Sequence, residues 1–220
     1  MANRCFSLII AAILLLFGQT RYFGQSNEND LLHQKIEVHF TDATLLYVLN
    51  KLAAIQGIPI GLEKSATEEY KAKLNIDVEN GTLKEVLNAI IQQEPAYKWE
   101  VIDGVINFTP TAKRYSFVAI LLDTSVNCFA PVKGISKFGI RDTITNLPEV
   151  RSLLTANNIG VERFMDYPYR ESIYANSKVN LNMSNTTVRG ILNKVVKDSE
   201  HKIWVVEMSG RHNGNLLISF

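Results

Sequence analysis

The residues that could support catalysis or bind a metal are few and scattered along the chain. The four histidines are His33, His39, His201 and His212. No two of them are three or four residues apart, and no cysteine or carboxylate pair completes a set of metal ligands. The sequence contains no G-x-S-x-G, P-loop, G-x-G-x-x-G or H-E-x-x-H motif. We therefore expect surface histidines and a protein that is not an enzyme and holds neither metal nor cofactor.

The composition is that of an ordinary globular protein. The chain has 220 residues, of which 46% are hydrophobic and 20% charged, and this excludes collagen and a disordered tail. The formal net charge of +1 gives no basic excess that would indicate a nucleic-acid partner. Cys5 and Cys128 alone cannot form a disulfide framework. We expect Cys128 to be a buried small hydrophobic residue, and pairing between two chains is the alternative.

The first 26 residues are predicted to be a signal peptide. Arg4 precedes an uncharged apolar run, residues 6–17, which matches a signal-peptide core and is shorter than the ~20 apolar residues of a membrane span. Small residues follow, and cleavage is expected near 24–26. An uncleaved N-terminal anchor is the alternative, and it is the only membrane attachment that the sequence suggests.

Three segments of the remaining chain repeat one another without a gap. They are residues 36–52, 74–90 and 179–195, and each begins with alternating apolar residues, typical of a half-buried strand. The apolar spacing then changes to i, i+3, i+4, i+7, which predicts one face of a helix. The helix can be capped by Asp42, Asn80 or Asn185, or by the threonine two residues later. Thr82 with Glu85 fits a capping box.

The intervening segments complete an α+β fold. A turn at Asp103-Gly104 predicts a hairpin, so that residues 34–110 have the order β-α-β-β-α-β-β. In the second half we expect an apolar strand at 115–122, a loop at 127–141, a helix at 147–158 and an insertion at 163–177. Segment 152–163 loosely resembles 51–64 and suggests a degenerate fourth unit. The predicted organisation is a domain over 34–110 and a related one over 114–220, each a small mixed β-sheet with two helices.

The first half resembles a known family. The stretch IEVHFTDATLLYVLNKLAAIQGIPIGLE, followed by LNIDVENGTLKEVLNAI and YKWEVIDGVINF, is similar to the secretin/TonB short N-terminal (STN-like) domain. The resemblance covers residues 34–110 and recurs in half-form at 178–220. It implies a periplasmic interaction module or adaptor that docks on a secretin, a TonB-dependent receptor or an anti-sigma type component. Association with the outer membrane is a further alternative.

Five residues are candidates for the interaction surface. They are Leu46, Tyr47, Phe138, Tyr167 and Tyr169. Leu46 and Tyr47 lie off the apolar stripe of the first helix, and such a pair marks either a docking site or packing against the second module. A sheet edge that accepts a partner's strand is another candidate. The tyrosines of 167–174 support an alternative function, binding of a small ligand or glycan in the periplasm, because aromatic rings stack on apolar ligand faces.

Overall fold

The computed structural model describes residues 28–64, 73–112, 117–162, 179–209 and 214–220. The predicted signal peptide lies outside these residues. So do Tyr167 and Tyr169, with the predicted insertion that contains them.

The first half has the predicted order of strands and helices. Its elements are α2 (Glu28–His33), β1 (Lys35–Ala43), α3 (Leu45–Gln56), β2 (Ile60–Glu63), β3 (Leu74–Thr82), α4 (Leu83–Gln93), β4 (Tyr97–Ile102) and β5 (Val105–Pro110). Asp103 and Gly104 both have positive φ, as a tight hairpin between β4 and β5 requires. The fold is α+β, with helices packed on mixed and antiparallel sheets.

The turns between strand and helix show which of the two predicted caps is used. Thr44 and Thr82 are N-caps, and Thr82 forms the predicted capping box with Glu85. The acidic or amide residues two positions earlier are not caps. Asp42, Asn80 and Asn185 instead have φ of 53°, 51° and 50°, the left-handed conformation that Asn and Asp tolerate best after glycine. The repeated residue therefore reverses the chain, and the threonine after it caps the helix.

The second half continues as α5 (Phe117–Leu122), β6 (Ser125–Ile135), α6 (Lys137–Thr145), α7 (Pro148–Ala156), β7 (Gly160–Val161), β8 (Val179–Thr187), α9 (Val188–Asp198), β9 (Ile203–Ser209) and β10 (Asn215–Ser219). The prediction of a strand at 115–122 is wrong, because 117–122 is helical. Leu121 and Leu122 are buried whereas Ile120 is 51% exposed, so this short apolar run has one covered helical face. Periodicity alone does not separate a short buried helix from a strand.

The prediction of a loop at 127–141 is also wrong. β6 covers most of it and pairs antiparallel with β8, and α6 follows, capped by Ser136. The pairing has two register shifts, between Phe129 and Val132 and between Val132 and Ile135. Such bulges accommodate Pro131 and the positive φ of Gly134 within a strand, which is why the segment resembles a loop in sequence.

The outer sheets of the two halves have matching registers. β1 pairs with β3 through Val38↔Val78, Phe40↔Ile76 and Ala43↔Leu74, and β6 pairs with β8 through Phe129↔Met183, Val132↔Leu181 and Ile135↔Val179. Val78, Ile76 and Leu74 occupy the same repeat positions as Met183, Leu181 and Val179. The second half therefore contains a strand equivalent to β1, although the sequence of β6 hides it.

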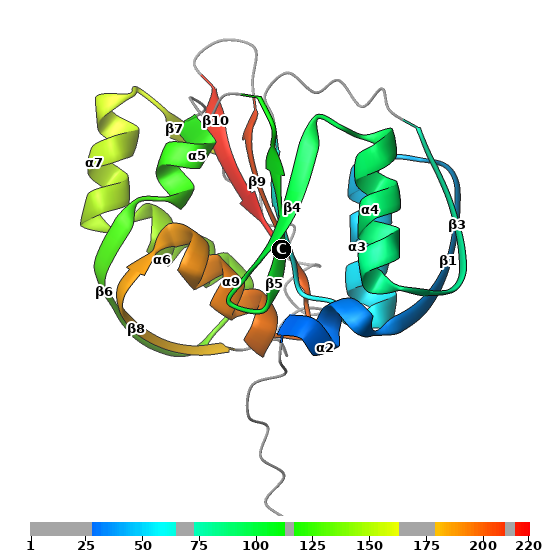
Figure 1. Ribbon diagram of the computed structural model, residues 1–220. Helices are drawn as coiled ribbons and strands as arrows, with labels where there is room; N and C mark the ends of the chain where they lie inside the picture. Colours follow the sequence, from blue (N-terminus) through cyan, green and yellow to red (C-terminus); the bar gives the residue numbers. More distant parts are fainter. Residues whose placement is uncertain (1–27, 65–72, 113–116, 163–178, 210–213) are drawn as a thin grey trace, which may run out of the picture.

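The inner strands of both halves form one continuous sheet. Its order is β4-β5-β2-β9-β10-β7, and the halves are joined where β2 pairs in parallel with β9. Helices α3 and α4 and the β1–β3 sheet lie on one side of it, and α5, α6, α7, α9 and the β6–β8 sheet lie on the other (Figure 1).

Each side of the central sheet has its own hydrophobic core. Ile106 and Phe108 of β5 belong to the core beneath α3 and α4, whereas Val105 belongs to the core beneath α9. On β9, Ile203 and Val205 join the first core, and Trp204 and Val206 join the second. Alternation along a strand thus divides the same strands between both cores.

Candidate interaction surfaces

The outward side of α3 carries large apolar side chains in solvent. Tyr47 is 52% exposed and Ile55 70% exposed. The ring of Phe40, on β1, meets the Tyr47 ring edge to face with 6.4 Å between centroids, and Lys51 Nζ lies 5.4 Å from the Tyr47 centroid. Phe40, Tyr47, Lys51 and Ile55 are called the α3 surface below. A cation over an aromatic ring beside exposed apolar groups can bind an apolar partner that also carries negative charge.

This surface is specific to the first of the three repeated helices. At the position of Tyr47 the other helices have Glu85 and Gly190, and at the position of Ile55 they have Gln93 and Asp198. The apolar exposure is therefore not a property of the repeat itself.

Of the five predicted residues, the three that the structure describes do not form one site. Leu46 is half-buried and packs against the first core, so it supports α3, and only Tyr47 of the pair is mainly exposed. Phe138 lies in α6, on the other side of the central sheet from α3 (Figure 1). Tyr167 and Tyr169 lie outside the described residues.

The junction of the two halves contains buried charged groups that the sequence analysis did not identify. Arg189 on α9 donates from Nη2 to Glu63 on β2 at 3.1 Å, and the two side chains are 5% and 2% exposed. The same Nη2 lies 3.5 Å from Asp123. Lys64, the residue that follows Glu63 in the chain, forms an ion pair with Glu207 of β9. These contacts link residues of the first half to residues of the second.

Asn193 and Trp204 add further polar contacts at the junction. The Trp204 indole donates to Asn193 Oδ1 at 2.8 Å, and Asn193 Nδ2 donates to the Ile102 carbonyl at 3.2 Å. Trp204 is fully buried and lies over Gly61 of β2, where an added Cβ would be 2.2 Å from the indole ring. Gly61 is therefore needed so that the indole can cross the neighbouring strand.

One sequence signal could have identified this junction. Arg189 and Asn193 are four residues apart on α9, so they share one face of the helix. This face is polar, whereas the apolar stripe lies on another face and is already expected to be buried. The sequence does not say that the central sheet of the other half covers that face.

His39 lies on the exposed face of the β1–β3 sheet, as predicted. Its Nδ1 is 2.6 Å from Asp77 Oδ1, and its Nε2 is 3.2 Å from Glu37 Oε1. Hydrogen bonds to the Glu37 and Asp77 carboxylates raise the pKa of His39 above its ordinary value, because they stabilise the imidazolium. The side chain remains 54% exposed.

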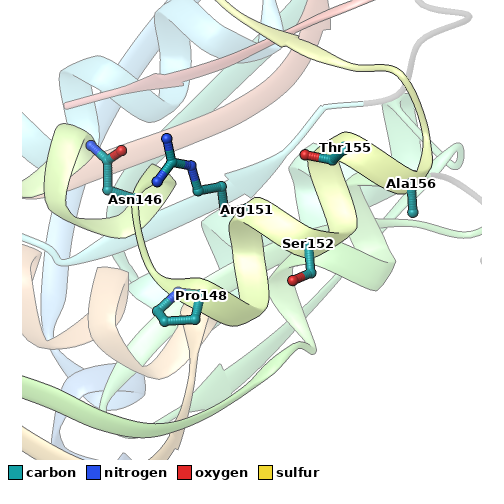
Figure 2. A pocket seen from close by; sticks show the side chains of 6 residues that line it. All are labelled: Asn146, Pro148, Arg151, Ser152, Thr155 and Ala156. Carbon is teal, nitrogen blue, oxygen red and sulfur yellow. The ribbon is translucent and has the colours of Figure 1, made fainter.

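A hollow of about 590 Å³ lies along α7 and reaches Asn146, the residue that follows α6. Its lining residues, Asn146, Pro148, Arg151, Ser152, Thr155 and Ala156, are all exposed. In the view of Figure 2 the Arg151 side chain extends toward Asn146, whereas Ser152 projects from the opposite side of α7. The hollow offers hydrogen-bonding groups and one cation, without a carboxylate or histidine that could act as a base.

Two further observations concern reactive groups. Cys128 is exposed, so the prediction that it is buried is wrong; its neighbour Phe129 is the residue that packs in the core. Among the described residues, no group of three or more His, Cys, Asp or Glu side chains could hold a metal ion.

Comparisons with protein-family models, with curated proteins and with solved structures find no match for this chain. No helix within the described ranges is long and apolar enough to cross a membrane.

Proposed function

We propose that this protein is an exported periplasmic interaction module or adaptor that docks on an envelope component of the secretion, receptor or signalling type. The proposal combines the predicted signal peptide with the resemblance of residues 34–110 to the STN-like domain. The observation that carries it is the α3 surface, where Tyr47 and Ile55 are exposed at positions that are polar or glycine in α4 and α9. A partner protein with apolar side chains and a carboxylate fits the rings, the aliphatic group and the Lys51 ammonium of this surface.

The geometry of α3 favours docking over a structural role for this surface. Leu45, Val48, Leu49 and Leu52 already bury the inward face of the helix. Residues 47, 51 and 55 recur at four-residue spacing and form a second, outward face. Exposed aromatic and aliphatic groups contribute to binding when a partner removes them from water.

The test is affinity capture of the tagged chain from envelope extract, compared with a variant that carries Tyr47→Glu and Ile55→Gln. These changes introduce the residues that α4 has at the same positions, so the helix tolerates them. Ile120→Gln is the matched control, because Ile120 is a similarly exposed apolar residue on α5. We expect the variant to reduce capture of a specific envelope protein about tenfold or more, as loss of a binding hot spot does, and the control to capture normally.

Equal capture by the variant and the wild type would contradict the assignment of the α3 surface. A folded wild-type chain that captures no envelope protein would favour the alternative, a periplasmic protein that binds a small ligand or glycan. A thermal-shift screen with envelope sugars and lipids would then detect that ligand, because binding to the folded state raises the melting temperature.

A further inference from the structure

Among the residues that the structure describes, the central sheet ends at β4 on one side and at β7 on the other. β4 corresponds to β9 and β2 to β7 in the order of the repeat, and β2 of the first half pairs in parallel with β9 of the second. The helices of the halves cover opposite faces of the sheet (Figure 1). One half is superposed on the other by a half-turn about an axis that lies in the plane of the sheet and runs across its strands, combined with a translation along that axis. Repetition of that operation does not close on itself.

The end of the sheet at β7 has the same residues as the β2 side of the junction. Residues 60–63 read Ile-Gly-Leu-Glu and residues 159–162 read Ile-Gly-Val-Glu. The two segments also pair alike within their own halves, since Gly61 is opposite Asn107 and Gly160 is opposite Asn215. Gly160 is exposed and Val161 is half-buried, so the strand that matches β2 is accessible. We call Gly160–Glu162 the donor end.

The opposite end of the sheet, at β4, has the counterparts of the residues that face β2. Lys84, Asn88 and Trp99 occupy the repeat positions of Arg189, Asn193 and Trp204. The three residues of the second half are buried in the junction, whereas Lys84 and Asn88 are exposed and Trp99 is half-buried. The two halves have a basic residue at the first of these positions, and they have the same residue, asparagine and then tryptophan, at the second and third. We call Lys84, Asn88 and Trp99 the acceptor end.

We propose that a second copy of this chain adds head to tail, with the donor end of one copy against the acceptor end of the next. β7 then pairs in parallel with β4, as β2 pairs with β9. Glu162 meets Lys84 as Glu63 meets Arg189, and the Trp99 indole covers Gly160 as Trp204 covers Gly61. This self-association goes beyond the proposed docking function and uses different residues, so either can fail without the other.

The contact is expected to be weak and reversible. β7 has only two residues, and β4 carries Lys98 and Glu100, and both short strands and charged side chains limit edge pairing. The junction within the chain does not face this limit, because both halves are covalently linked and the effective concentration is high.

The test is sedimentation of the purified chain over a range of concentrations up to about 1 mM, which covers weak specific contacts. Lys84→Glu alters only the acceptor end, and Glu162→Lys alters only the donor end. Asn88→Arg, at an exposed helix position, is a second acceptor-end variant. Glu79→Lys is the control, because Glu79 is an exposed residue of the β1–β3 sheet and belongs to neither end. Melting curves verify that each variant is folded.

We expect the mean mass of the wild type and of Glu79→Lys to rise past that of a dimer with concentration. For each end variant alone, the Kd of self-association should be at least about tenfold higher than for the wild type. In such a solution the unaltered end of one copy can meet only the altered end of another. An equimolar mixture of Lys84→Glu and Glu162→Lys should again associate past a dimer, since every contact between the two variants joins opposite charges: one contact keeps the original pair, and the other has the two charges exchanged between positions 84 and 162. A wild type that stays monomeric at every concentration would overturn the proposal. So would end variants, including Asn88→Arg, that associate like the wild type, or a mixture that associates no more than either charge variant does alone.

Discussion

At the scale of single residues, His39 is a group whose protonation the surrounding carboxylates control. Hydrogen bonds to Glu37 and Asp77 raise its pKa in the folded chain above the ordinary value of about 6.5. A raised folded-state pKa means that the folded chain binds the proton more tightly than the unfolded chain. The stabilisation is therefore complete below the unfolded-state pKa and is lost as the pH rises through the folded-state pKa.

NMR titration of the His39 ring should give a pKa above 6.5 in the wild type. The pKa should fall in Glu37→Gln and in Asp77→Asn, and Glu79→Gln is the control, since Glu79 is exposed on the same strand as Asp77. The loss of stability in His39→Gln should be larger at about pH 5 than at about pH 8, because the ion-paired imidazolium exists only at the lower pH. A pKa unchanged by both carboxylate substitutions would contradict the assignment.

Gly61 is the second residue whose role a single substitution can test. A Cβ at this position would lie 2.2 Å and 2.3 Å from two atoms of the fully buried Trp204 indole. We expect Gly61→Ala to destabilise the chain by about 1–3 kcal/mol, because the indole and the strand must move apart. Urea unfolding followed by tryptophan fluorescence measures the free energy of unfolding.

Gly160→Ala is the control for this prediction. Its Cβ would meet the side chain of Asn215, whose amide oxygen would be 2.4 Å away. Gly160 and Asn215 are both exposed, so the Asn215 side chain can turn away. Equal losses of stability in the two variants would show that contact with Trp204 is not what requires glycine at position 61.

At the scale of elements, the turn from strand to helix is the feature that all three repeats share. Asn80, near the end of β3, has a φ of 51°, and a β-branched side chain is strained in that conformation. Asn80→Gly should leave the free energy of unfolding nearly unchanged. Asn80→Val should lower it by about 1–2 kcal/mol.

Glu79→Val provides the comparison, because Glu79 is exposed in the same strand and is not among the residues with positive φ. Chemical denaturation of the three variants measures the differences. Similar losses for Asn80→Val and Glu79→Val would mean that loss of polarity, and not the backbone conformation, causes the effect.

At the scale of the whole molecule, the buried ion pair between Glu63 and Arg189 links the two halves. Arg189→Met leaves the Glu63 carboxylate buried beside an apolar side chain, and we expect a loss of about 3–5 kcal/mol in the free energy of unfolding. The double variant Glu63→Leu with Arg189→Met should recover most of this loss, because the buried carboxylate that loses its contact with Arg189 is then absent as well. Asp123 is half-exposed and remains hydrated in both variants.

Lys194→Met is the matched control, because Lys194 forms an exposed ion pair with Asp198 on the same helix. Such a pair contributes about 0.2–0.5 kcal/mol. Equilibrium denaturation measures all four chains. A double variant no more stable than Arg189→Met would contradict the view that loss of the Arg189 contact to the buried Glu63 carboxylate is the main cost.

The sequence by itself determined the local structure of the repeats. Alternation predicted the strands at 36–40, 74–78 and 179–183, and the helical spacing after them predicted α3, α4 and α9, since these patterns depend on near neighbours. Asp103-Gly104 predicted the hairpin, and Thr82 with Glu85 predicted the capping box, for the same reason. Where local signals conflicted, the prediction failed: β6 contains Pro131 and Gly134, and α5 is too short for its period to be seen.

Only the tertiary structure decided which surfaces stay exposed. Arg189 and Lys84 are equivalent in sequence, yet the central sheet of the other half buries Arg189 and leaves Lys84 in solvent. Leu46 and Tyr47 are consecutive residues of α3 that both lie outside its apolar stripe. Leu46 nevertheless packs on the first core, whereas Tyr47 does not. Burial depends on contacts between residues far apart in the chain, such as Glu63 with Arg189, and a periodic pattern describes only one element at a time. The pairing of β2 with β9 supplies those contacts here, because it joins the two halves into one sheet and gives α9 a second covered face.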